Sequence, residues 1–378
     1  MTKVWSPPAP EDVDFRAEIR AWLRENIPQK PAPAFYTPDR RAYDAAWQRS
    51  LLEGGFGALG WPTELGGREV TVSQQMIFHE ELANAGAPDV GCLFIALNHA
   101  GPTVATRGTQ AQRERHIPRI LRGEELWCQG FSEPEAGSDL ASIRTRGDVH
   151  GDVVVVNGSK IWTSYAHLAD FCELLINTDR SAGRHKGLTW MILDMRTPGV
   201  TVRPIKTLTG NPRFSEVTFD DVEVPLDNVV GGLNNGWSVA MSTLGFERGS
   251  AMMGRQVRTL RRIEELRDYA EKNGALADPL VRAELDALRR DAFAVRALVH
   301  RSLKPHTHAQ GASSVLRVFH SELVGRLTRL AMRIQGEEVV TLGSWNLEYL
   351  NELRSKVTAG TLDIHRDIIG NRLLGLPR

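Results

Sequence analysis

The sequence predicts a multidomain α+β protein with an all-β middle region between two helical regions. Apolar residues recur at helical spacing in the first third of the chain, strand-length apolar runs fill the middle, and helical spacing returns after Gly231-Gly232. We expect domains at 1–125, 126–231 and 232–378. Because this order lacks βαβ alternation, a doubly wound nucleotide-binding fold is excluded.

The N-terminal region is expected to be helical. Its first helix should follow Asp12 or Asp14 as N-cap. The apolar face of this helix comprises Phe15, Ile19, Trp22 and Leu23. Helical character resumes over residues 76–85 and 110–121, after breaks at the proline-rich residues 28–38 and at Trp61-Pro62.

The middle region has the pattern of short strands. Val153–Val156, Asn157-Gly158 and Ile161–Thr163 predict a β-hairpin, because Asn-Gly is the usual type I′ turn pair. Further strands are expected at 171–176, 188–193, 200–205 and 217–224. In the last region, breaks near Asn273-Gly274 and Asp278-Pro279 separate long helical patterns and predict a helix bundle.

The composition excludes several classes of protein. The 378 residues are 42% apolar and 24% charged, which is typical of a soluble globular protein, and the 46 Lys and Arg balance the 46 Asp and Glu. A net charge of zero argues against a general nucleic-acid binder. The three scattered cysteines suggest neither disulfides nor a metal site, and no secretion signal or membrane span is evident, so we expect a cytoplasmic protein.

Two neighbouring segments carry the most information about chemistry. Residues 129–139 form a polar loop with a small-residue turn, whose backbone N–H groups could face an anion or a flavin edge. In Lys160–Ser164, strand alternation places Trp162 and Ser164 on the same side, which suits a flat heteroaromatic cofactor. From the pattern alone, an ordinary loop and a core tryptophan stay open as alternatives.

These segments resemble the acyl-CoA dehydrogenase family. The resemblance lies in Ser132-Glu133-Pro134-Glu135-Ala136-Gly137-Ser138-Asp139 and Lys160-Ile161-Trp162-Thr163-Ser164 at the family's separation. It extends along the chain through Trp61-Pro62, Phe219–Pro225 and Ala359-Gly360-Thr361. The family implies the acyl-CoA dehydrogenase fold, with a helical N-domain, a β-barrel middle domain and a C-terminal four-helix bundle.

The resemblance also implies FAD as cofactor and assigns residues to it. The Phe131 backbone and Ser132 would hold the pyrimidine side of the flavin, Trp162 would cover one face, and Ser164 would bond N5 or O4. Thr361 would contact the ribityl-pyrophosphate. Ser138 would lie near the pantetheine or phosphate part of CoA.

The family's base is displaced in this chain. Much of the family has Glu directly before the Gly-Thr of the tail motif, where this chain has Ala359. The isovaleryl and long-chain branches instead carry it in Leu-x-x-Glu-Arg, which matches Leu244–Arg248. The resemblance thus makes Glu247 the base and Arg248 a substrate contact, with the Ala359 N–H bonding the thioester oxygen. Without the family, a Glu-Arg pair on a helix is an ordinary solvated surface.

Two motifs that a family subunit donates to its neighbour's FAD are altered. The Arg-x-x-Phe-Gly motif is at best Lys272–Leu276, and Gln-x-Leu-Gly-Gly has become Val340–Ser344. The motifs that serve the chain's own active site are largely intact, whereas those donated to a neighbour are altered. A tetramer is expected, and this difference suggests the base-bearing half of an α2β2 enzyme, as in bacterial members of the family that act on steroid side-chain CoA thioesters.

The resemblance therefore predicts an oxidoreductase of lipid β-oxidation or steroid catabolism. It would convert an acyl-CoA thioester, with a bulky, branched or steroid-derived acyl group, into the trans-2-enoyl-CoA and pass electrons to an electron-transferring flavoprotein. Two alternatives stay open: a non-catalytic subunit that completes a partner's FAD site, and a flavin oxidase or monooxygenase.

Overall fold

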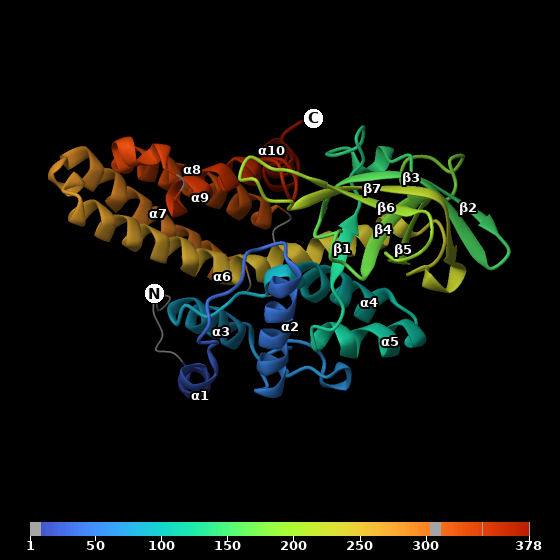
Figure 1. Ribbon diagram of the computed structural model, residues 1–378, viewed down its shortest axis with the longest axis horizontal. Helices are drawn as coiled ribbons and strands as arrows, with labels where there is room; N and C mark the ends of the chain where they lie inside the picture. The colour runs from blue at the N-terminus through green and yellow to red at the C-terminus, as the bar shows by residue number, and fades with distance from the viewer. Residues whose placement is uncertain (1–8, 303–310, 342, 378) are drawn as a thin grey trace. The chain divides into compact units, whose positions relative to one another are not determined.

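The computed structural model describes residues 9–302, 311–341 and 343–377, except for the side chains of 247–251. Figure 1 shows helices from both ends of the sequence and one sheet from its middle. The chain divides into two compact units. The sheet unit comprises residues 17–71 and 87–248, and the bundle unit comprises residues up to 16, 72–86 and 249–378.

The predicted helices form, although the helix expected over 76–85 spans Val72–Asn84 and the first helix also begins earlier than expected. Helix α1 (Pro10–Asn26) begins before Asp12, so neither Asp12 nor Asp14 is its N-cap as expected. Pro10 suits a first helical position because proline lacks the N–H that would go unbonded there. Within the sheet unit, α2 (Pro38–Glu53) and α4 (Gly101–Arg107) precede α5, whose bounds Gln110–Leu121 match the prediction. A capping box of Thr109 and Gln112 fixes the start of α5.

The strands form one curled seven-stranded sheet of order β1-β4-β2-β3-β7-β6, with β5 pairing β4 (Figure 1). The strands are β1 (Trp127–Gly130), β2 (Arg146–His150), β3 (Val153–Ser164), β4 (Phe171–Asn177), β5 (Leu188–Asp194), β6 (Val200–Ile205) and β7 (Phe214–Pro225). Alternation on β4 sends Leu175 into the apolar cluster shared with the helices, whereas Leu174 enters the cluster on the other face. Both faces of β4 are therefore buried.

The predicted hairpin at Asn157-Gly158 is wrong. β3 runs straight through these residues, and the actual hairpin joins β2 to β3 around Gly151. Gly158 sits at a register shift with φ +143°, where a Cβ would lie 2.8 Å from the Thr145 Cα. Asn157 instead exchanges hydrogen bonds with Asp221 on β7. The glycine therefore serves a β-bulge and a close backbone approach rather than a turn.

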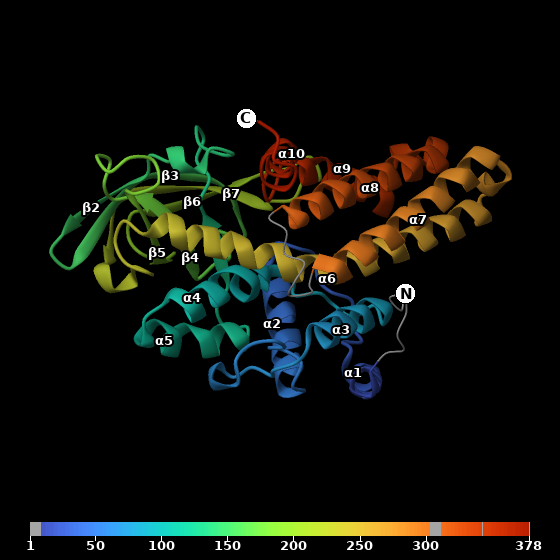
Figure 2. The ribbon, with the colours of Figure 1, turned by 180° about the vertical axis from the view of Figure 1, so that it is seen from behind.

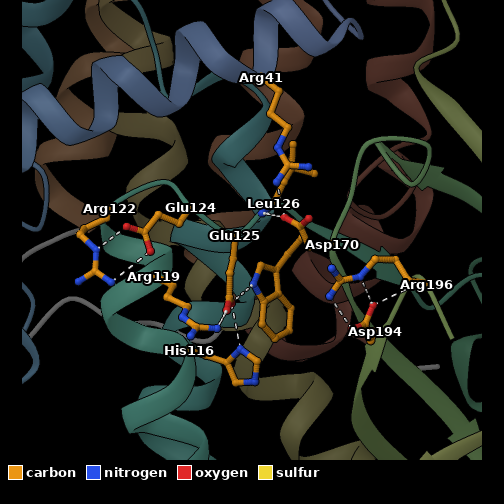
Figure 3. A network of polar contacts seen from close by, with 11 residues as sticks. Arg41, His116, Arg119, Arg122, Glu124, Glu125, Leu126, Asp170, Asp194 and Arg196 are labelled. Carbon is orange, nitrogen blue, oxygen red and sulfur yellow. Dashed lines mark hydrogen bonds and ion pairs between the residues drawn. The ribbon is translucent and has the colours of Figure 1, made fainter.

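Polar contacts in the sheet unit hold the start of β1 against the helices (Figure 3). Asp170 bonds Arg41 of α2 at 2.5 Å and accepts the Leu126 N–H at 2.9 Å. The Glu125 carboxylate lies 2.9 Å from Nδ1 of His116, on α5. Because the strand that carries the polar loop begins here, these contacts help to position the loop.

The bundle unit contains the long C-terminal helices, and α7 and α8 run side by side in Figures 1 and 2. Its helices are α3 (Val72–Asn84), most of α6 (Gly236–Lys272), α7 (Pro279–Ser302), α8 (Ala312–Gln335), α9 (Ser344–Glu352) and α10 (Leu362–Ile368). The breaks predicted between Asn273 and Pro279 are confirmed. In the described ranges, no helix is long and apolar enough to cross a membrane.

Candidate functional site

The polar loop after β1 is closed by a tight turn and by one carboxylate. Glu133 and Ala136 exchange backbone hydrogen bonds of 3.0 and 3.1 Å. The Glu133 side chain accepts the N–H groups of Arg144 at 2.6 Å and Thr145 at 2.9 Å. A carboxylate that accepts two backbone amides ties both ends of the loop together.

Lys160 joins this loop to β3. Its fully buried ammonium donates to the Phe131 carbonyl at 3.1 Å and to Glu133 Oε1 at 2.8 Å. The Ile161 N–H also donates to the Ser132 carbonyl at 2.9 Å. The two segments that carry the predicted flavin contacts are thus held in one fixed arrangement.

Burial and pairing act in opposite directions on this ion pair. Burial lowers the pKa of Lys160 to about 8, although the Glu133 carboxylate opposes the shift. Burial also disfavours ionised Glu133, but Lys160 and the amide donors outweigh it and hold the pKa of Glu133 below its usual range. Sequence analysis assigned no role to Lys160. A lysine within a buried strand, two positions before Trp162, could have indicated a buried ion pair.

Trp162 is not a core residue. Its side chain is 57% exposed, and its backbone has φ +60° at a register shift between β3 and β7. The ring meets Phe214 edge-on at 6.0 Å between centroids. A left-handed tryptophan is strained, and such strain concentrates at functional sites. Ser132 and Ser164 are half-buried, so the sheet unit offers an open aromatic plane and accessible hydroxyls, which fit a flavin.

The other predicted contacts of the sheet unit have different surroundings. The Phe131 side chain is buried in the core, consistent with a role for its backbone only. Ser138 is exposed, and the following Asp139 forms an ion pair with Arg184. Arg184 is therefore a cation close to the predicted CoA contact that sequence analysis did not single out.

The tail motif in the bundle unit forms a left-handed turn. Ala359 has φ +55° and Gly360 has φ +87°. His365 Nε2 lies 3.1 Å from the Ala359 carbonyl oxygen, and its Nδ1 lies 3.0 Å from the hydroxyl of Ser314 on α8. Thr361 caps α10 by accepting the Ile364 N–H at 3.2 Å. The turn is thus held by the His365 imidazole, to which sequence analysis assigned no role.

Glu247 and Arg248 lie in α6, and their side chains are outside the described residues. Position 247 follows Thr243 by one helical turn. The buried Thr243 hydroxyl lies 2.9 Å from that of Thr103, which donates to the His99 carbonyl at 2.7 Å. Of the two altered motifs, Lys272 ends α6 with Gly274 in the left-handed region, while Leu342 in the second lies outside the described residues.

The single sheet lies between two helical regions in the chain, and Trp162 is exposed on a strand that a buried ion pair holds; both features agree with the acyl-CoA dehydrogenase fold that the motifs predict. Three family profiles match: acyl-CoA dehydrogenase, N-terminal domain over residues 9–124, middle domain over 128–222 and C-terminal domain over 234–374. The chain belongs to the acyl-CoA dehydrogenase family, and the predicted fold class is confirmed.

Individual relatives agree with this assignment. The acyl-CoA dehydrogenase IpdE1 of Mycobacterium tuberculosis is 38% identical over 97% of this chain and 99% of its own. The ChsE4-ChsE5 complex from the same organism is 28% identical, with a TM-score of 0.83 over 99% of this chain and 100% of that one. The Tcur3481-Tcur3483 steroid ACAD is 27% identical, with a TM-score of 0.86 over 98% and 99%.

The protein is thus an FAD-dependent acyl-CoA dehydrogenase, an oxidoreductase that acts on the CH–CH bond of an acyl-CoA. The comparisons favour this function over a non-catalytic subunit and over an oxidase or monooxygenase. Among the described residues no group of His, Cys, Asp and Glu is arranged to hold a metal ion.

Proposed function

We propose that this chain takes the α-proton of a bulky, branched or steroid-derived acyl-CoA with Glu247 and yields the trans-2-enoyl-CoA. The observation that carries the assignment is that Ala359 leaves the tail motif without a carboxylate, while α6 supplies Glu247 one turn beyond the anchored Thr243. Proton removal needs a base within reach of the α-carbon, and a carboxylate is an ordinary choice.

The remaining residues bind and orient the reactants. The Phe131 backbone, Ser132, Trp162, Ser164 and Thr361 would hold FAD, which when bound accepts the β-hydride. The Ala359 N–H would donate to the thioester oxygen, where negative charge develops as the α-proton leaves. Ser138 and Arg248 would contact the CoA thioester.

Support for a bulky acyl group comes from space and from relatives. A Cβ at Gly245, two residues before the proposed base, would meet nothing within 4 Å. One structural relative is described as a steroid ACAD, and a partial relative from Syntrophus aciditrophicus is a cyclohexane-1-carbonyl-CoA dehydrogenase, 33% identical over 63% of this chain. A ring-bearing thioester is therefore the first substrate class to test.

A Glu247→Gln variant tests the base. Co-expressed with a partner subunit, the variant should load FAD as the wild type does, but lose at least about a hundredfold in the rate of anaerobic flavin bleaching by substrate, because it cannot accept the proton. Glu264→Gln is the matched control, since Glu264 lies on the same helix in an exposed pair with Arg289. Normal bleaching by Glu247→Gln would remove Glu247 from the mechanism.

The proposal includes a second subunit type in an α2β2 tetramer, an electron-transferring flavoprotein as acceptor, and a cytoplasmic location. Support comes from the altered Lys272–Leu276 motif, from two-component structural relatives and from three free, buried cysteines, which suit a reducing compartment. Expressed alone, the chain should load FAD poorly, and co-expression with a partner dehydrogenase subunit should restore the 450 nm absorbance. A fully loaded, active homotetramer would refute the heteromeric assembly.

A further inference from the structure

Three strained aromatic residues lie in the sheet unit. Among the described residues, six besides glycine have a positive φ, and three of these carry large rings: Tyr36 at +69°, Trp162 at +60° and Tyr165 at +61°. A bulky residue rarely adopts this left-handed conformation, and it persists only where the surroundings enforce it. Tyr36 lies in the proline-rich crossing before α2, whereas the other two lie at or just after the end of β3. Contacts between these segments must therefore hold the strain.

Arg213 connects Tyr36 to the end of β3. Its Nη1 donates to the Tyr36 hydroxyl oxygen at 2.9 Å, and its carbonyl oxygen accepts the Tyr165 N–H at 3.2 Å. The rings of Tyr36 and Tyr165 pack together with 5.1 Å between centroids. The Tyr36 carbonyl oxygen lies 3.2 Å from His167 Nε2. Tyr36 is thus tied to the residues that follow β3 by its hydroxyl, its ring and its backbone.

The same arginine leads to Trp162. Arg213 directly precedes Phe214, the first residue of β7, and its guanidinium lies 5.6 Å from the centroid of the Phe214 ring. The Phe214 ring meets the Trp162 ring edge-on, and Phe214 pairs with Ser164 across the sheet. Trp162 itself sits where the register between β3 and β7 shifts, so the regular ladder does not fix its backbone. Contacts through Phe214 and Arg213 hold it instead.

Tyr36 has the surroundings of a support rather than of a ligand contact. It is buried, whereas Trp162 is exposed. Its hydroxyl accepts a hydrogen bond from a charged donor, and such bonds are stronger than those between neutral groups. A buried residue that is fixed at three points can enforce an unfavourable conformation on its neighbours.

We propose that Tyr36 is a positioning residue, which through Arg213 and Tyr165 holds Trp162 in its left-handed conformation, and that the held indole keeps molecular oxygen away from reduced FAD. The inference rests on the proposed function, in which Trp162 covers one face of the flavin.

The held indole matters because of a side reaction. Molecular oxygen can take two electrons and two hydrogens from FADH2, which yields hydrogen peroxide and oxidised FAD and leaves no electrons for a protein acceptor. Enclosing a reactive group excludes small molecules and suppresses such reactions. An indole that is fixed in place encloses the face that it covers, whereas one that can swing away does not.

The first test measures the reaction with oxygen. FAD-loaded enzyme, co-expressed with a partner subunit, is reduced anaerobically with dithionite and mixed with air-saturated buffer, and the return of the 450 nm absorbance is timed. Tyr36→Phe removes only the hydroxyl that Arg213 bonds. We expect about tenfold faster reoxidation, because losing this bond raises the share of displaced indole. Tyr43→Phe on α2 is the matched control and should reoxidise as the wild type does. An unchanged rate in Tyr36→Phe would overturn the proposal.

A double variant shows whether Tyr36 acts through Trp162. Trp162→Ala should reoxidise fastest, and adding Tyr36→Phe to it should change nothing, since the ring to be positioned is gone. Equal acceleration by Tyr36→Phe with and without the indole would overturn the proposal. A merely structural role of Tyr36 would lower FAD loading but leave the reoxidation rate of the loaded protein unchanged.

A third comparison needs no flavin. Glycine adopts a left-handed φ without strain, so Trp162→Gly should unfold less readily in urea than Trp162→Ala, by about fivefold in the unfolding equilibrium constant. Tyr36→Phe should shrink this advantage, because position 162 is then less strongly forced into the left-handed region. An advantage that stays the same would overturn the positioning role, even in variants that hold no FAD.

The outcomes distinguish this inference from the proposed function. Flavin bleaching by an acyl-CoA thioester, with reoxidation that does not respond to Tyr36→Phe, would leave the proposed function intact and sink only this inference. No bleaching by any thioester would contradict the proposed function and with it the shielding of FAD. A glycine advantage that depends on Tyr36 would then still support the positioning of Trp162.

Discussion

The flavin loop of the sheet unit and the tail turn of the bundle unit are held in contrasting ways. In the sheet unit, a buried ion pair of Lys160 and Glu133 joins two segments 27 residues apart in sequence. In the bundle unit, hydrogen bonds from His365 to the Ala359 carbonyl and from Arg317 to the Thr358 carbonyl at 2.8 Å hold a single turn. We expect the first arrangement to be more costly to break than the second, because removing one partner of the ion pair leaves a buried charge unpaired.

The largest effect is expected at the ion pair. Lys160→Met leaves the Glu133 carboxylate buried without its cation, which should cost about 3–5 kcal/mol of unfolding free energy and release FAD. Urea unfolding and the 450 nm absorbance measure the two effects. Lys160→Arg keeps the charge, so its stability and FAD loading should lie between those of the wild type and of Lys160→Met. Unchanged FAD loading in Lys160→Met would show that the Lys160–Glu133 pair is not needed to hold the flavin loop.

The same pair predicts a pH dependence. The folded-state pKa of Lys160, about 8, lies below the usual value near 10.5, so the unfolded state binds more protons between these values. The unfolding free energy of the wild type, relative to Lys160→Met, should therefore rise with pH from about 8 to 10.5, by at most about 1.4 kcal/mol per pH unit. A flat or falling difference would mean that the buried ammonium keeps its proton throughout.

A smaller effect is expected at the tail turn. His365→Phe removes the donor to the Ala359 carbonyl and the partner of Ser314, and should lower kcat about tenfold while FAD loading and KM change little, because one hydrogen bond positions the turn. His365→Gln, which can still donate, should recover part of the loss. If both variants match the wild type, Ala359 does not need this hydrogen bond.

Local pattern was sufficient for most of the fold. The helix at 110–121, the strand at 200–205 and the break before Pro279 follow from periodicity and from Gly, Pro and capping residues, all of which act within a few residues. The prediction failed at Asn157-Gly158, because the close approach of Thr145 and pairing with β7 decide between a turn and a bulge.

The site divides in the same way. Motifs identified Trp162 and Ser132 as flavin contacts, and they showed that Glu is absent at position 359 and present at position 247. The roles of these residues stay predictions. Lys160 was named only as part of a motif and Glu173 not at all, although a charge within the run Phe171–Ile176 was a visible signal. Their meaning depends on which groups face them.

By itself the sequence determined the order of helices and strands, the family and the residue types available for chemistry, since these depend on short-range pattern. Only the tertiary structure decided that Trp162 is open, that Lys160 meets Glu133, and that the buried Glu173 meets Gln129 and His99. The physical reason is that burial and pairing of a polar group are set by residues 27 to 74 positions away, which no local pattern encodes.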